Sequence, residues 1–118
     1  MQKRVVIVTG ATSGLGLAIV NCISRDEEYA VICVDITSSE EVREIAYESY
    51  KLDLSNRELI MQFVDSILSK PDISLYGIVN VAGISVGKSI VGMNDEDWDK
   101  MIEVNLTAPA LLISKLQD

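Results

Sequence analysis

Three glycines near the N-terminus lie at a spacing that could serve a bound anion. Gly10, Gly14 and Gly16 follow the apolar residues 5–8, and a helical apolar pattern begins within the same segment. A buried strand, a glycine-rich turn and a helix start bring backbone N–H groups and the positive end of a helix dipole toward a pyrophosphate. Glycine suits such a turn because it adopts positive φ freely and lets a ligand approach the backbone. The spacing predicts an anion-binding turn, although such glycine spacings also occur in turns of other α/β proteins.

An aspartate follows the next apolar stretch at an interval that fits a nucleotide. Asp35 lies 19 residues after Gly16, directly behind residues 30–34. In dinucleotide-binding folds an acidic side chain about 20 residues beyond the glycine turn meets the ribose hydroxyls. A carboxylate there accepts from a 2′-hydroxyl and repels a 2′-phosphate. The interval therefore predicts NAD as the preferred cofactor over NADP, and an exposed aspartate at a strand end is the alternative.

Strands and helices alternate along the chain, which brings these side chains to one edge of a sheet. Apolar runs predict strands at residues 5–9, 30–34, 50–54 and 75–82. Near-continuous apolar strands joined by helices indicate a parallel sheet covered on both faces. The predicted fold is α/β, a Rossmann-like doubly wound parallel sheet of strand order 3-2-1-4 that lacks C-terminal strands. The fourth strand would be an apolar edge, which points to a missing neighbour.

Helical spacing and capping residues predict the elements between the strands. A first helix should bury one apolar face, made of Leu15, Ala18, Ile19, Cys22 and Ile23. A brief helix is expected in residues 37–44. Ser55 and Glu58 form a predicted capping box for the next helix, which should end before Pro71.

The last predicted helix carries a polar residue on its apolar face. Asn94 should cap this helix, which runs through Trp98 and Asn105. Pro109 has no N–H to donate to the Asn105 carbonyl, and its ring crowds that carbonyl. We therefore expect a kink at Asn105 that leaves its carbonyl free. The alternative is that Asn105 only braces the helix interior.

Composition narrows the possible partners. The chain has 118 residues and a net charge of −8, which argues against nucleic acid and anionic membranes. No apolar run approaches the ~20 residues of a membrane span, and no signal peptide is evident. Histidine is absent, which excludes histidine-based catalysis and most zinc sites, so no metal is expected. Cys22 and Cys33 are predicted to be buried thiols, which fits the reducing cytoplasm. The length predicts a single, incomplete domain over residues 1–118.

Four motifs in order resemble the short-chain dehydrogenase/reductase family. Its T-G-x-x-x-G-x-G motif corresponds to Thr9–Gly16, and its N-N-A-G motif appears as Asn80-Val81-Ala82-Gly83. Asp53-Leu54 stands where the family has an acidic residue beside the adenine. Residues 97–106 resemble the helix that bears the asparagine of the catalytic tetrad.

The resemblance implies a site that follows the dinucleotide from end to end. Contacts to the pyrophosphate and ribose would come from Gly10, Thr12, Ser13, Gly14, Leu15 and Gly16, with Asp35 and Ile36 at the adenine ribose. Asp53 and Leu54 would flank the adenine, and Asn80, Ala82, Gly83 and Val104 would lie toward the nicotinamide. Asn105 would be the catalytic residue. Val81 replaces the second asparagine of the motif, so we expect the loss of a hydrogen bond that braces the sheet rather than of cofactor binding.

The family's catalytic pair, Y-x-x-x-K on a helix, does not follow Asn105 in this chain. Tyr47 and Lys51 have the spacing but fall in a predicted turn and strand, where residues four apart lie ~13 Å from each other. The interpretation is the dinucleotide-binding N-terminal part of an NAD-dependent oxidoreductase, inactive alone, that in a complete homo-oligomeric enzyme acts on a small carbonyl or alcohol. A non-catalytic NAD-binding module and a fold relative such as a methyltransferase are the alternatives.

Overall fold

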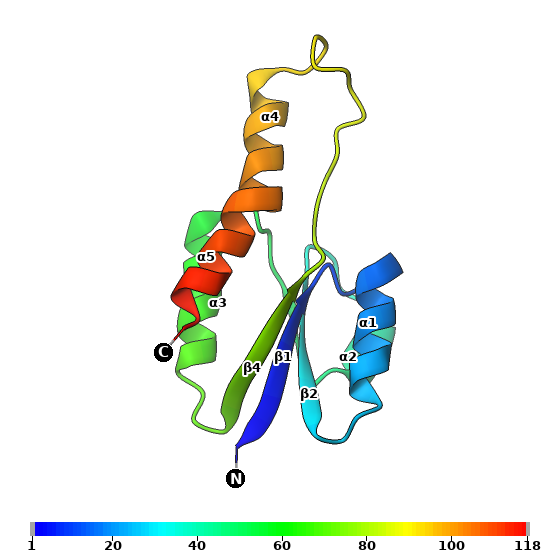
Figure 1. Cartoon of the computed structure of the whole chain (residues 1–118), viewed down its shortest axis with the longest axis vertical. Coiled ribbons are helices and arrows are strands. Elements are labelled where there is room, and N and C mark those ends of the chain that lie inside the picture. The colour runs from blue at the N-terminus through cyan, green and yellow to red at the C-terminus, as the bar shows by residue number, and fades with distance from the viewer. Residues whose placement is uncertain (1, 118) are drawn as a thin grey trace.

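A four-stranded parallel sheet organises the protein, whose computed structural model describes residues 2–117. Its strand order is β3-β2-β1-β4, which confirms the predicted order. The strands are β1 Lys3–Thr9, β2 Tyr29–Asp35, β3 Glu48–Lys51 and β4 Ile73–Asn80. Helices α1 and α2 cover one face of the sheet, and α3 and α5 cover the other (Figure 1).

The helices are α1 Gly14–Ser24, α2 Glu40–Ile45, α3 Arg57–Leu68, α4 Asp95–Ile102 and α5 Ala108–Lys115, with a π-helical turn, η1 Glu103–Thr107, between the last two. Asn94 caps α4 as predicted, since its side chain accepts from the Asp97 N–H. The predicted capping box of Ser55 and Glu58 is wrong. Asn56 caps α3 instead by accepting from the Leu59 N–H, because Asp53 already engages the Ser55 side chain.

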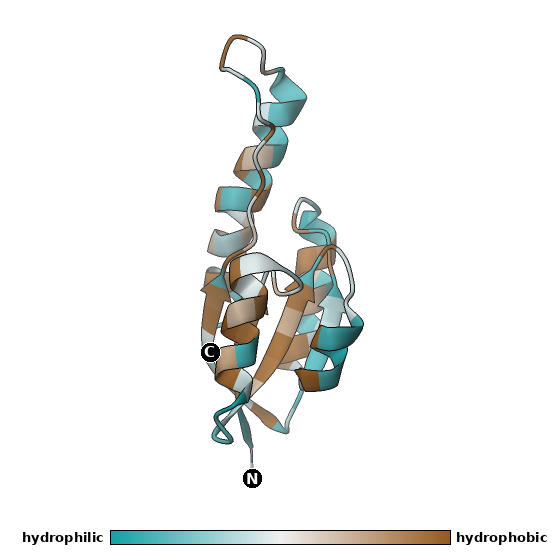
Figure 2. Ribbon diagram, turned by 90° about the vertical axis from the view of Figure 1, so that its right-hand side faces the viewer, coloured by the Kyte–Doolittle hydropathy of each residue, from teal (hydrophilic) through white to brown (hydrophobic). Residues whose placement is uncertain are grey.

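The central strand β1 supplies both layers of the core. Val5 and Ile7 face α3 and α5, and Val6 and Val8 face α1 and α2, as the two-residue period of a strand requires. All four are buried. Figure 2 shows the strands as mostly apolar ribbons between the two helical layers. Each strand begins one or two residues earlier than predicted, β2 extends one residue further to Asp35, and β3 and β4 end before Leu52 and Val81.

The predicted apolar face of α1 is correct for Ile19 and Ile23, which pack against the core, and wrong for the other three residues. Leu15, Ala18 and Cys22 are exposed, whereas Gly16 and Val20 are buried against the sheet. The reason lies at Gly16, where an added Cβ would stand 1.8 Å from the Gly10 carbonyl oxygen. A helix that starts this close to the turn must direct its glycine toward the sheet. Cys33 in β2 is buried as predicted, and burial raises the pKa of its thiol to about 12.

Beyond the sheet, the chain extends into an arm made of residues 83–94 and α4 (Figure 1). None of the residues of α4 is buried, and Ile90 and Val91 in the preceding segment are exposed. The predicted kink at Asn105 takes the form of the π turn η1, in which the Ala108 N–H donates to the Glu103 carbonyl. In residues 2–117 no helix combines the length and apolarity needed to cross a membrane.

Candidate dinucleotide-binding site

The carboxyl ends of the strands enclose a hollow of about 270 Å³. Eight of the residues predicted to bind the cofactor line it: Gly10, Ser13, Asp35, Ile36, Leu54, Ala82, Gly83 and Val104. Of the other predicted residues, Thr12 lies in the adjacent turn, and Gly14, Leu15 and Gly16 form the first turn of α1. Asp53 precedes Leu54, Asn80 ends β4, and Asn105 follows Val104.

Three residues that sequence reasoning missed also line the hollow: Leu52, Val81 and Ile84. Leu52 precedes Leu54 by two positions, and both side chains are buried. The two-residue period could therefore have identified Leu52. Val81 and Ile84 flank the predicted Ala82 and Gly83. Their place in the same segment behind β4 could therefore have identified them.

The three glycines of the motif are required for different reasons. Gly10 has a φ of 65°, and an added Cβ there would lie 2.8 Å from the Ala82 nitrogen. Together with Gly16, it lets the turn, α1 and the segment behind β4 pack closely. Gly14 has a φ of 57° and would meet nothing within 4 Å. Its surroundings are thus open, and its conformation favours glycine.

The N-terminus of α1 is available to an anion. Ser13 is the N-cap and its side chain makes no capping hydrogen bond, and the first turn carries no acidic residue. The Leu17 N–H donates to the Ser13 carbonyl as the first bond of the helix. The N–H groups of residues 14–16 therefore lack intrahelical partners and stand at the positive end of the helix dipole.

Asp35 is tied to the glycine turn. Its Oδ2 accepts from the Thr12 N–H at 3.0 Å and from the Thr12 hydroxyl at 2.7 Å, and its Oδ1 accepts from the Thr37 N–H at 3.3 Å. Partial burial alone would raise the pKa of this carboxyl, but the hydrogen bonds from Thr12, Thr37 and Ile36 outweigh it and hold the pKa below its usual range. Asp35 is therefore a fixed negative charge at neutral pH.

Thr9 joins β1 to the segment behind β4. Its side chain is buried, and its Oγ1 accepts from the Val81 and Ala82 N–H groups, each at 3.1 Å. This brace uses backbone donors, so the valine at position 81 does not remove it. The site keeps its shape through Thr9 rather than through the side chain at position 81.

Asn105 pins the same segment from the other side. Its Oδ1 accepts from the Ile84 N–H and its Nδ2 donates to the Ile84 carbonyl, both at 2.8 Å. A Cβ on Gly83 would lie 3.3 Å from that Oδ1, so glycine allows this close approach. The side chain of Asn105 is thus engaged with the backbone of the segment behind β4.

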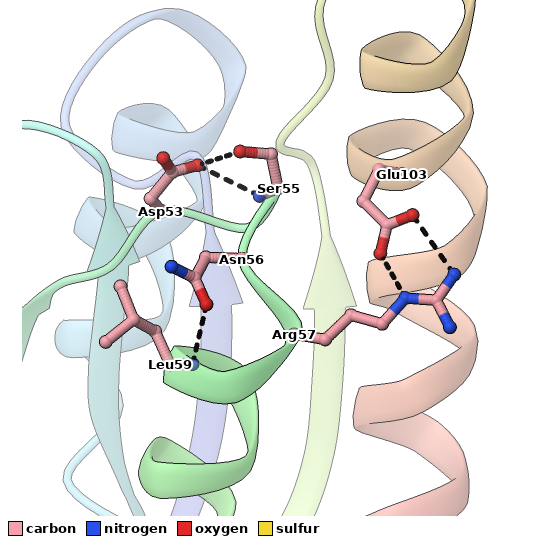
Figure 3. A network of polar contacts seen from close by, with 6 residues as sticks. All are labelled: Asp53, Ser55, Asn56, Arg57, Leu59 and Glu103. Atoms are coloured by element: carbon pink, nitrogen blue, oxygen red, sulfur yellow. Dashed lines mark hydrogen bonds and ion pairs between the residues drawn. The ribbon is translucent and has the colours of Figure 1, made fainter.

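Two polar contacts frame the Asp53 side of the site (Figure 3). The Asp53 Oδ1 accepts from the Ser55 hydroxyl at 2.7 Å and the Ser55 N–H at 2.9 Å, and these bonds lower the pKa of Asp53. Arg57 then meets Glu103 with two parallel bonds, Nε to Oε1 at 2.5 Å and Nη2 to Oε2 at 3.2 Å. This ion pair fastens η1 to the start of α3.

Tyr47 and Lys51 do not form a catalytic pair on a helix. Tyr47 precedes β3 and Lys51 ends it, in agreement with the predicted turn and strand. The Tyr47 hydroxyl donates to Asp72 Oδ2 at 2.5 Å. Among residues 2–117, no group of three or more histidine, cysteine, aspartate or glutamate side chains is arranged to hold a metal ion.

Comparisons with known proteins agree with this geometry. A family profile described as short chain dehydrogenase matches residues 4–117. The short chain dehydrogenase ausX of Emericella nidulans is 30% identical over 116 residues, which cover 96% of this chain and 58% of that protein. The chain spans about half the length of the curated relatives it matches.

Solved structures share the fold and include both cofactors. A metagenomic short-chain oxidoreductase in complex with NADP has a TM-score of 0.83 and 29% identity, over 98% of this chain and 55% of that one. A short chain dehydrogenase from Leptospira borgpetersenii with bound NAD+ has a TM-score of 0.77 and 27% identity, over 98% and 45%. The strand order, the glycine turn and the family match together establish that this chain belongs to the short-chain dehydrogenase family.

Proposed function

We propose that this chain is the NAD-binding part of a short-chain dehydrogenase/reductase, an incomplete nucleotide-binding domain within residues 1–118. The observation that carries the proposal is Asp35, an ionised carboxylate that lines the hollow and is bonded to the glycine turn. A carboxylate at this position accepts from ribose hydroxyls and repels a 2′-phosphate. NAD is therefore preferred over NADP.

The surrounding residues fit the rest of the dinucleotide. The free N–H groups of residues 14–16 would hold the pyrophosphate. Leu52 and Leu54, which line the hollow, give an apolar surface to the adenine, and Ala82 and Gly83 line the side toward the nicotinamide. The bound nicotinamide would supply hydride transfer with a small carbonyl or alcohol substrate. This chain contributes binding and orientation.

Asn105 is the residue of the catalytic set that this chain contains. Its side chain orders the segment at Ile84. Its carbonyl cannot receive an α-helical hydrogen bond from Pro109, which has no N–H. We propose that this carbonyl accepts a hydrogen bond from a water molecule that passes protons in the complete enzyme.

A non-catalytic NAD-binding module is the second candidate function. The hydrogen bond of Tyr47 to Asp72 favours it. No other tyrosine precedes a lysine by four positions, and Tyr47 is bound to Asp72. General acid–base catalysis typically contributes about 10²–10⁴-fold in rate. We expect no dehydrogenase turnover from these 118 residues. NADH oxidation with a carbonyl substrate that is lost in Tyr47→Phe would overturn this expectation.

The wider setting follows from the same proposal. The free thiols Cys22 and Cys33 fit a reducing cytoplasm. The net charge of −8 argues against nucleic acid as a partner. A homo-oligomer is proposed because apolar side chains of β4 and α5 reach the surface.

Calorimetric titration of the chain with NAD and with NADP tests the proposal. The native chain should bind NAD at least about tenfold more tightly than NADP, a difference of about 1.4 kcal/mol. Asp35→Ser should narrow that gap, whereas Asp65→Ser, an exposed position on α3, should leave it unchanged. Equal or tighter binding of NADP by the native chain would refute the assignment.

A further inference from the structure

Thr12 contacts Asp35 rather than the hollow. The resemblance placed Thr12 among the cofactor contacts, yet Thr12 does not line the hollow. Its N–H and its hydroxyl both donate to Asp35 Oδ2. A carboxylate oxygen offers two lone pairs, so these two bonds occupy Oδ2.

The other carboxylate oxygen has spare capacity. Asp35 Oδ1 accepts a long bond from the Thr37 N–H at 3.3 Å, and Asp35 lines the hollow. The Thr37 hydroxyl lies 3.1 Å from the Thr12 hydroxyl and completes the cluster. Because hydrogen bonds to a charged acceptor are stronger than neutral ones, the Thr12 bonds fix the rotation of the carboxylate.

We propose that Thr12 is a specificity-determining positioning residue, whose hydroxyl occupies Asp35 Oδ2 and thereby presents Oδ1 to the ribose hydroxyls of NAD. The inference rests on the proposed NAD site. NADP gains less from this orientation, because a phosphate that the carboxylate repels replaces its 2′-hydroxyl. Thr12 therefore changes the ratio of the NAD and NADP affinities.

The test measures NAD and NADP binding by Thr12→Val, which keeps the shape of threonine and removes the hydroxyl. NAD should bind about five- to tenfold more weakly, in line with the loss of a hydrogen bond to a charged group, and NADP should change by less than about twofold. Thr12→Ser should restore the native ratio. Thr37→Val keeps both Thr12–Asp35 bonds and should also keep the ratio.

A purely structural role predicts a different result. If Thr12 only shapes the turn, Thr12→Val weakens the binding of NAD and of NADP equally, and that result would overturn the inference. The proposed function would still be supported by the NAD preference of the native chain. In the Asp35→Ser background, Thr12→Val should no longer alter the ratio, and a further change there would also overturn it. Circular dichroism verifies the fold, and Thr12→Ala gives the same readout if the valine variant does not fold.

Discussion

The two sides of β1 differ in how completely they are packed. Toward β2, the strand residues 31–34 are buried, and Asp35 at the end of β2 accepts a hydrogen bond from Thr12 in the turn. Toward β4, Tyr76 is 63% exposed and Ile113 on α5 is 49% exposed. No charged residue lies within β4 to protect its open edge. The nucleotide side is thus held by hydrogen bonds between segments far apart in the sequence, whereas the β4 side presents a surface suited to further protein.

The two hollows of these regions differ in chemistry as well as in size. The larger one, about 650 Å³, lies between β4 and α5 and has only uncharged linings such as Ser74 and Gln117. The smaller one holds the Asp35 carboxylate and the turn at Gly10 and Ser13. A dinucleotide needs donors for its phosphates and an acceptor for its ribose. The donors and the acceptor favour the smaller hollow as the candidate site, whereas volume alone would favour the larger one.

Glycine substitutions should give the largest difference in stability between the two regions. Gly16→Ala forces a Cβ against the Gly10 carbonyl, so we expect a loss of about 3 kcal/mol in the free energy of unfolding and no measurable NAD binding. Gly77→Ala in β4 meets nothing within 4 Å and should gain about 0.5 kcal/mol. Urea denaturation followed by circular dichroism measures both. Equal losses from the two variants would contradict the difference in packing.

The sequence predicted the order of the strands, including the apolar edge at β4, but not the contacts that only the folded chain creates. Strand order and the proximity of Gly10 to Asp35 followed from apolar runs and one interval. Part of the face of α1 was mispredicted because apolar spacing does not reveal that Gly16 must approach the turn. Ser55 was mistaken for a cap because the competing bond to Asp53 depends on how the chain leaves β3. The role of Thr12 depended on a tertiary contact with Asp35 that no spacing encodes.

Self-association should use the open side. We expect concentration-dependent dimers in analytical ultracentrifugation, because apolar edges left in water recruit partners. Ile113→Glu, which places a charge in the groove beside β4, should weaken the dimer about tenfold. Ser114→Glu adds the same charge on α5 outside the groove and should have little effect. A strict monomer at high concentration would contradict the expectation.

The smallest expected effect distinguishes two aspartates by their response to salt. The pKa of Asp35 is lowered by hydrogen bonds from uncharged donors that outweigh its burial, whereas that of Asp97 in the arm is lowered chiefly by Lys88. Both depressed values stabilise the fold above about pH 4, the usual range of aspartate, and this stabilisation is lost as the pH falls through the folded pKa. In carbon-detected NMR titrations, 1 M salt should return Asp97 toward its usual pKa and leave Asp35 low. A matching shift at both residues would contradict this distinction.

The most direct test is to map NAD binding on the native chain by amide chemical shifts. The account predicts that NAD shifts the amides of residues 10–16, 35–36 and 82–84 and of Val104 and Asn105, while residues 73–78 and 113–117 around the larger hollow stay unchanged. Shifts concentrated in the groove between β4 and α5, or no shifts at saturating NAD, would contradict the claim that the carboxyl ends of the strands form the dinucleotide site.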